Sequence, residues 1–126
     1  MKHASQNKPR QISVIVPVYN EEKNLEQFYE VITSTFSPLA YEFELLFIND
    51  GSFDTSQAII EKLAQSDERV TFVEFSRNFG KELATTAGFH ACTGDAALCI
   101  DADLQHPPEL ISYFFKKWEE GADIVV

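Results

Sequence analysis

Positive charge is scarce in this sequence. The 126 residues include 10 lysines and arginines against 20 aspartates and glutamates, which gives a formal net charge of −10 at pH 7. Proteins that bind nucleic acid non-specifically need a basic surface, so this composition argues against such a partner. The composition does not exclude the binding of a small anionic ligand, because a bound metal ion can reverse the sign of the local potential. The few cations therefore become informative positions.

Cysteine and long apolar runs are scarce as well. Cys92 and Cys99 have the spacing of neither a metal site nor a redox motif, and we expect two reduced thiols in the core of a cytosolic protein. No apolar run reaches the roughly 18 residues that cross a bilayer. The apolar stretch at 12–18 contains Pro17 and lacks a small-residue cleavage site. It predicts a strand after a disordered tail at 1–11, not a signal peptide.

Apolar runs of strand length alternate with segments of helical periodicity. Strands are expected at 12–18, 43–50, 70–75, 96–102 and 123–126. Helices are expected at 21–36, 54–67, 81–93 and 107–120. This alternation predicts an α/β domain with a mostly parallel sheet and helices on both of its faces. Ligands of such sheets bind beyond the carboxyl ends of the strands, so the residues that follow each strand are the candidates for a site.

Two of the expected helices carry local signals at their starts. Glu21 and Glu22 open the helix at 21–36, as the helix dipole favours. The apolar residues of that helix fall on one face, at Leu25, Phe28, Tyr29, Ile32 and Phe36. Asp54 is expected to cap the helix at 54–67, because a short carboxylate accepts hydrogen bonds from the open N–H groups there.

Polar side chains follow the first two strands. Pro17 has no N–H to give to a sheet, so the first strand must end or bulge there. Tyr19 then offers a ring face and a hydroxyl group, and Glu21 stands at the helix start. After the second strand, Asp50 belongs to the stretch NDGS, which is a turn by composition. A turn and a helix cap explain both stretches. The alternative is that Asp50 accepts hydrogen bonds from the N–H groups of a base.

Two cations follow the third strand. Arg77 and Lys81 lie in the stretch SRNFGKE, where a strand end, a glycine and a helix start come together. Backbone N–H groups at a helix start favour anions, so this stretch suits an anionic group. The alternative is a solvated loop with two surface cations, and the sequence leaves both interpretations open.

Two acids follow the fourth strand. Asp101 and Asp103 alternate with one alanine, so in an extended segment both carboxylates point the same way. Hard oxygen ligands at a strand end suit Mg²⁺ or Mn²⁺, and Gln105 adds an amide oxygen on the same side. A D-x-D pattern is common by chance, so the argument rests on its place beside the other polar strand ends. His106 is expected in an exposed loop rather than next to the metal ion.

The strand ends together predict a site for a metal-chelated nucleoside diphosphate, with aspartate for the base, the D-x-D for metal and ribose, and cations for the phosphates. A dinucleotide-dependent oxidoreductase or a nucleotidyltransferase would want a glycine-rich loop at 17–22, and PVYNEE has no glycine. A phospho-receiver module would need an acceptor aspartate after the third strand, and EFSRN has none. A nucleotide-binding module without activity remains an alternative.

Four stretches together resemble glycosyltransferase family 2 with the GT-A fold: VIVPVYNEEKNL, FINDGSFDTS, SRNFGKELATTAGFHACTGDA and IDADLQHPPELI. The resemblance runs from Ile12 to Val126. The first two stretches are shared by the wider family. SRNFGKE followed by DADLQ-x-PPE is more specific to the polyprenyl-phosphate branch, which includes dolichyl-phosphate mannose synthase and bactoprenol glucosyltransferase. The resemblance implies a Rossmann-like GT-A domain, with 12–126 as its nucleotide-sugar-binding part.

The resemblance also implies roles for individual residues. The nucleotide pocket would comprise Pro17, Tyr19, Glu21, Ile48, Asp50, Lys81, Asp101 and Ala102. Asp50 would contact the base, while Asp101 and Ala102 would lie against the ribose and diphosphate. Asp103 and Gln105 would hold a divalent metal ion, Mg²⁺ or Mn²⁺. Arg77, Asn78, Gly80 and Lys81 form a family motif near the site, without single assigned roles.

The implied reaction is metal-dependent and inverting. A sugar would pass from a UDP-glucose-like or GDP-mannose-like donor to a polyprenyl phosphate. A chain that ends in the apolar stretch DIVV is expected to be truncated, without the acceptor-binding half and its catalytic residues. We expect the fragment to be cytoplasmic, inactive alone and prone to self-association, and the full-length enzyme to act at the cytoplasmic face of the membrane. The alternative is a nucleotide-binding fragment or module without transferase activity.

Overall fold

Strands and helices alternate in the computed structural model, which describes residues 11–39, 41–103 and 113. The strands are β1 (Gln11–Val18), β2 (Glu42–Asn49), β3 (Val70–Glu74) and β4 (Ala96–Cys99). The helices are α2 (Leu25–Phe36), α3 (Ser56–Ser66) and α4 (Lys81–Ala91). The strands pair in parallel in the order β3-β2-β1-β4, which confirms the predicted parallel α/β sheet.

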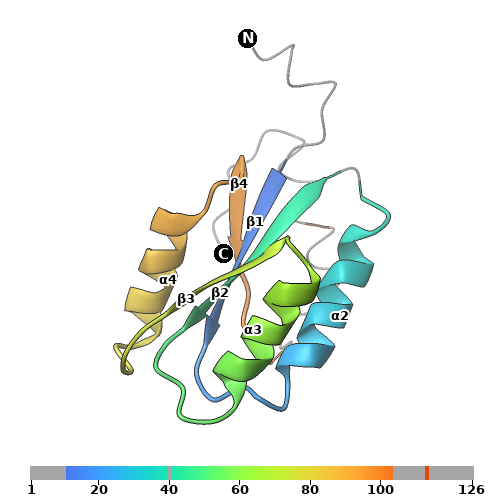
Figure 1. Ribbon diagram of the computed structural model, residues 1–126. Coiled ribbons are helices and arrows are strands. Elements are labelled where there is room, and N and C mark those ends of the chain that lie inside the picture. The colour runs from blue at the N-terminus through green and yellow to red at the C-terminus, as the bar shows by residue number, and fades with distance from the viewer. Residues whose placement is uncertain (1–10, 40, 104–112, 114–126) are drawn as a thin grey trace.

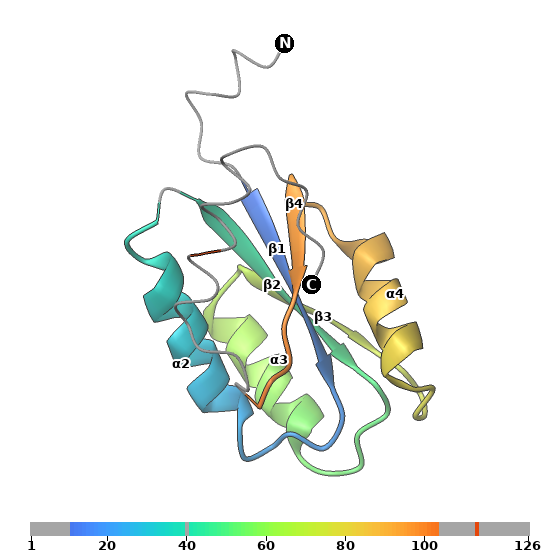
Figure 2. The same ribbon diagram turned by 180° about the vertical axis from the view of Figure 1, so that it is seen from behind.

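The helices lie on both faces of the sheet, as predicted. α2 and α3 cover one face and α4 covers the other (Figures 1 and 2). The larger core packs the sheet against α2 and α3 through residues such as Val14, Val16 and Phe28. The smaller core packs the opposite face against α4 through Ile15 and Ala84. Successive residues of β1 therefore serve opposite cores, which explains why this strand is apolar at nearly every position.

The starts of two helices differ from the predictions. The helix expected from Glu21 begins at Leu25, because the N–H groups of Asn24 and Leu25 first bond to the Glu21 carbonyl in a turn. Thr55 occupies the N-cap position of α3 without a side-chain cap hydrogen bond, and the Asp54 carboxylate accepts the N–H of Ser56, the first residue of the helix, at 2.8 Å. The expected hydrogen bond between Asp54 and the start of α3 is therefore present, although the helix begins at Ser56, two residues later than predicted.

The fourth strand is shorter than predicted. It ends at Cys99, and Ile100 still donates its N–H to the Ile15 carbonyl at 2.9 Å before the chain turns at Ala102 and Asp103. The two acids of the D-x-D pattern therefore do not lie in one extended segment. The extended geometry from which a shared direction was predicted is absent, although both side chains line one hollow that is described below.

The tail was predicted at 1–11, but Gln11 is the first residue of β1, and positions 1–10 lie outside the described residues. The strand at 123–126 lies outside them too, as does the helix at 107–120 except for Tyr113, which is helical. Cys92 and Cys99 are free, as expected, but they are half-buried at the edge of the smaller core rather than inside it. In the part of the chain that the structure describes, no helix is both long and apolar enough to cross a membrane.

Candidate functional site

The loops after β1 and β2 are hydrogen-bonded to each other at the carboxyl end of the sheet. Asn20, in the first loop, has a φ of 54°, a left-handed conformation that non-glycine residues seldom adopt. Its N–H donates to the Ser52 hydroxyl at 2.8 Å, and its side-chain oxygen accepts the N–H of Phe53 at 3.0 Å. These reciprocal contacts hold Asn20 in its unusual conformation and fix the first loop against the second.

Further contacts join the same two loops where the helices begin. The N–H of Glu21 donates to the Ser56 hydroxyl at 2.9 Å, and the N–H of Glu22 donates to the Asp54 carboxylate at 3.2 Å. In return, the Glu22 carboxylate accepts the N–H and the hydroxyl of Thr55, and the hydroxyl bond lowers the pKa of Glu22. Glu22, Thr55 and Ser56 are absent from the predicted site, although Thr and Ser are residue types that bond to backbone groups in turns.

The loop after β3 is fastened to the loop after β2 by Asp50, which is buried. Its carboxylate accepts the N–H of Phe79 at 2.7 Å, the N–H of Gly80 at 3.0 Å and the side-chain amide of Asn78 at 3.1 Å. Asn78 and Gly80, singled out as part of a family motif, therefore lie near the site with their donors turned toward Asp50. The contact between Asp50 and a base stays a prediction.

An ion pair joins the start of α4 to the residues that follow β4. The ammonium group of Lys81 lies 2.6 Å from the Asp101 carboxylate, and the two side chains are 62 % and 30 % exposed. The hydrogen bond to Asp101, opposed by burial and helped by the negative charge of that residue, raises the pKa of Lys81. Lys81 therefore keeps its proton at neutral pH, and its exposed ammonium group retains donors for a further anion.

These strand ends meet around one hollow of about 320 Å³. The predicted site residues in its wall are Pro17, Tyr19, Glu21, Asp50, Lys81, Asp101 and Asp103. Val18 also lines it and is absent from the predicted set. Ile48 and Ala102 are buried in the two cores instead, and Gln105 lies outside the described residues. Reasoning from strand ends thus locates the hollow, while the roles of the individual residues stay predictions.

Carboxylates outnumber cations in this wall, with Glu21, Asp50, Asp101 and Asp103 against Lys81. Such a hollow suits a cation, or an anion that arrives together with one. Among the described residues, no group of three or more His, Cys, Asp or Glu could hold a metal ion. Mg²⁺ needs only one or two protein carboxylates when phosphates and water supply its other ligands. The residues present therefore fit a divalent ion that is shared with a phosphate ligand.

Aromatic rings stand beside the hollow. Tyr19 and Phe53 meet edge to face with their centroids 6.2 Å apart, and Phe53 is 83 % exposed. Exposed rings of this kind offer flat faces on which a base can stack. Arg77 lies with its guanidinium carbon 4.8 Å from the centroid of the Phe79 ring and is not among the lining residues, which favours the surface alternative for this cation.

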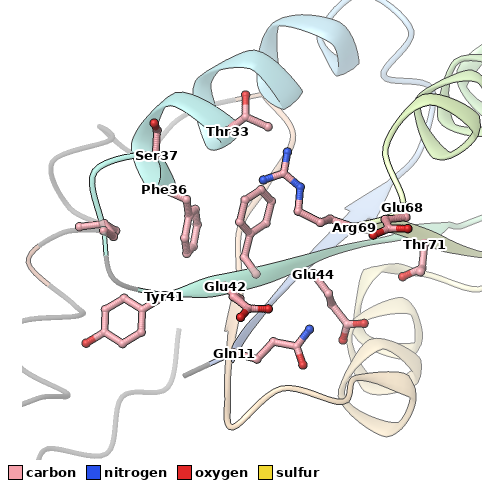
Figure 3. Close-up of a pocket in the computed structure, with 12 residues that line it drawn as sticks. Gln11, Thr33, Phe36, Ser37, Tyr41, Glu42, Glu44, Glu68, Arg69 and Thr71 are labelled. Carbon is pink, nitrogen blue, oxygen red and sulfur yellow. The ribbon is translucent and has the colours of Figure 1, made fainter. Parts of the chain in front are cut away.

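A larger hollow of about 750 Å³ lies at the amino end of the sheet (Figure 3). Its wall comes from the starts of β1, β2 and β3 and from the end of α2, and it includes no predicted site residue. Here Arg69 lies 4.5 Å from the centroid of the Phe43 ring and pairs with Asp67 at 2.8 Å. Tyr29 donates to the same carboxylate at 2.6 Å. These polar side chains therefore hold one another and join α2 to the start of β3.

Comparisons with known proteins identify the family to which the chain belongs. The family model for glycosyl transferase family 2 matches residues 13–126. Over 115 residues the chain is 48 % identical to a prophage bactoprenol glucosyl transferase homolog of Escherichia coli, which covers 91 % of this chain and 38 % of that protein. It is 47 % identical over 115 residues to the bactoprenol glucosyl transferase of Shigella phage SfV, with the same coverage of 91 % and 38 %. The chain thus spans 38 % of the length of these curated relatives.

Solved structures with a similar backbone are GT-A glycosyltransferases, which confirms the predicted fold. A mannosyltransferase from Pyrobaculum calidifontis, in complex with GDP-Man and Mn²⁺, matches with a TM-score of 0.66 and 28 % identity over 76 % of this chain and 28 % of its own. Glucosyl-3-phosphoglycerate synthase from Mycobacterium tuberculosis, in complex with Mn²⁺, UDP and glucosyl-3-phosphoglycerate, matches with a TM-score of 0.63 and 26 % identity over 92 % of this chain and 41 % of its own.

Proposed function

Because the chain belongs to glycosyl transferase family 2, we propose that it is the donor-binding part of an enzyme that transfers a sugar from a nucleoside-diphosphate sugar to a polyprenyl phosphate. The observation that carries the proposal is the hollow in which the polar strand ends meet. The likeness to bactoprenol glucosyl transferases supports the polyprenyl acceptor and favours a UDP-glucose-like donor. Such an acceptor would place the whole protein at the cytoplasmic face of the membrane.

In this proposal, different residues around the hollow contact different parts of the donor. The base lies near Tyr19, the ribose near Asp101 and the diphosphate near Lys81. Asp103 would hold a Mg²⁺ or Mn²⁺ ion together with Gln105. Such an ion, when bound, neutralises the charge that develops on the departing nucleoside diphosphate.

The chemistry asks little acid–base work of this chain. The acceptor phosphate is already an anion, so no residue has to remove a proton from it. One of its oxygens attacks the anomeric carbon opposite the diphosphate, the bond from that carbon to the diphosphate breaks, and the configuration is inverted. Lys81 keeps its proton and offsets part of the charge on the leaving group.

Calorimetric titration with UDP and GDP, each with and without Mn²⁺, tests the donor half of the proposal. We expect Mn²⁺-dependent binding of UDP, and much weaker binding of uridine, which lacks the diphosphate. A protein that binds neither UDP nor GDP would contradict the proposal. We expect no sugar transfer by this chain alone, because a transferase gains much of its rate by positioning both substrates. Transfer to a polyprenyl phosphate by the chain itself would overturn the restriction to donor binding.

A further inference from the structure

We propose that Asp50 is a positioning residue, whose carboxylate fixes the segment at 77–80 and thereby places Lys81 beside the donor diphosphate. This inference rests on the proposed function, because it assumes that the hollow takes a nucleoside diphosphate. It differs from the contact with a base that the family resemblance implies for the same residue. The two roles make different predictions, since one depends on the base of the ligand and the other does not.

The hydrogen bonds of Asp50 all come from one short segment. One carboxylate oxygen accepts the N–H of Phe79 at 2.7 Å, and the other accepts the N–H of Gly80 at 3.0 Å and the Asn78 side-chain amide at 3.1 Å. The Asn78 amide also donates to the Asp50 main-chain carbonyl at 3.2 Å. A carboxylate has about four acceptor positions, so most of this capacity is already used within the protein.

The burial of the Asp50 carboxylate strengthens these hydrogen bonds. Asp50 is 3 % exposed, and hydrogen bonds to an ionised group are roughly twice as strong as those between neutral groups. Removal of the carboxylate would leave the N–H groups of Phe79 and Gly80 without the partner that they have now. These N–H groups would then need water as a partner, so the segment would shift toward the solvent.

The backbone of the same segment packs directly on the turn that carries Asp50. Gly51 has a φ of +71°, and a Cβ atom placed on it would lie 2.2 Å from the Arg77 carbonyl carbon and 2.4 Å from the Asn78 nitrogen. The segment is therefore held by the carboxylate of one residue and by close contact with the next. Both contacts come from the loop after β2, so this loop determines where the segment lies.

The position of Lys81 follows from that of the segment. Gly80 is the residue before α4, and its carbonyl accepts the N–H of Ala84 at 3.1 Å, so Lys81 leaves the segment at a fixed point. From there its ammonium group reaches Asp101 at 2.6 Å, in the wall of the hollow. A shift of the segment would withdraw the ammonium group from a bound diphosphate, although Asp50 itself need not touch the ligand.

Calorimetry with two ligands, UDP and ribose 5-diphosphate, each with Mn²⁺, separates the two roles. We expect Asp50→Asn to lower the affinity for both ligands by the same factor, about tenfold. We expect the double variant with Lys81→Met to bind no more weakly than Lys81→Met alone, because residues that act as one unit are not additive. Amide exchange at Phe79 and Gly80 should quicken in Asp50→Asn and stay unchanged in Lys81→Met.

A loss confined to UDP, or additive losses in the double variant, would overturn the inference and favour base contact. Wild-type protein that binds neither ligand would overturn the proposed function, and this inference with it.

Asn78→Ala removes donors while keeping the Asp50 carboxylate, and should give a smaller loss of affinity, about threefold, that is again equal for both ligands. It provides the same comparison where Asp50→Asn does not fold. Glu44→Gln is the matched control, because its carboxylate anchors Ser13 and Thr93 at the opposite end of the sheet. We expect it to leave both affinities unchanged.

Discussion

The two ends of the sheet are built from similar contacts and differ in what those contacts leave open. At the amino end, Glu44 accepts the Ser13 hydroxyl at 2.7 Å and the Thr93 N–H at 2.9 Å, which ties the loop before β4 to the sheet. At the carboxyl end, Asp50 accepts the N–H groups of Phe79 and Gly80 in the same manner. Each end thus uses a carboxylate on β2 or just after it to fasten a loop that comes later in the chain.

The difference lies in the walls of the two hollows. The amino-end hollow is more than twice as large, about 750 Å³ against 320 Å³, yet the cation in its wall, Arg69, is already paired with Asp67, to which Tyr29 also donates. Both walls hold several carboxylates and one cation, but only the smaller hollow lies at the carboxyl ends of the parallel strands, where ligands of such sheets bind. Size therefore does not identify the site in this molecule, and the convergence of strand ends does.

The largest effects are expected at Gly51 and Gly94, two glycines that allow a loop to pack closely at the carboxyl end and at the amino end of the sheet. Gly51→Ala would place a methyl group 2.2 Å from backbone at a positive φ, and we expect unfolding to become easier by about 2–4 kcal/mol. Gly94→Ala at the amino end would meet the Ser13 hydroxyl oxygen at 2.7 Å, and we expect a smaller loss of about 1–3 kcal/mol. Urea denaturation measures both. UDP affinity should fall only in Gly51→Ala. Equal affinities in the two variants would contradict the claim that the donor binds at the carboxyl end of the sheet and not at the amino end.

The next largest effect is expected at Asp103, the proposed metal ligand at the carboxyl end. Asp103→Asn keeps the shape of the side chain and removes its charge, so Mn²⁺-dependent binding of UDP should weaken at least about tenfold, or about 1.4 kcal/mol. Because Asp103 is exposed, the free energy of unfolding of the variant should differ from that of the wild type by less than about 0.5 kcal/mol. Glu68→Gln, in the wall of the amino-end hollow, is the charge-matched control. Calorimetry that finds unchanged affinity in Asp103→Asn would remove Asp103 from the metal site.

Much of the fold and the place of the site follow from local sequence patterns. β-branched apolar runs predict the strands, and parallel pairing brings their carboxyl ends together, which is why Tyr19, Asp50, Lys81 and Asp101 meet. The orientation of Asp50 could not be predicted, because its partners lie 28 to 30 residues away. The direction of Asp103 was predicted from an extended strand, and the strand ends earlier. Local patterns thus predict which loops converge, and long-range hydrogen bonds decide how each side chain is used.

The smallest effect concerns pH at the amino end. Hydrogen bonds from Arg69 and Tyr29, which outweigh the opposing effect of burial, hold the pKa of Asp67 well below its usual range. A carboxyl group whose pKa is lower in the folded state stabilises the fold above its unfolded pKa of about 3.9, and loses that contribution as the pH falls toward the folded value. The Arg69 side chain is 47 % exposed, so solvent screening limits the contribution to about 1 kcal/mol.

Asp67→Asn should therefore be less stable than the wild type at pH 7 and should approach it as the pH falls from about 4 to 2, where the wild-type carboxylate loses its advantage. Urea denaturation of both proteins across this range measures the difference, and Tyr29→Phe, which removes one hydrogen bond and keeps the ion pair, should give a smaller one. UDP affinity at pH 7 should be the same in all three proteins, because these residues lie at the end of the sheet opposite the proposed donor site. A stability gap that stays constant with pH would show that Asp67 acts there by packing rather than by charge.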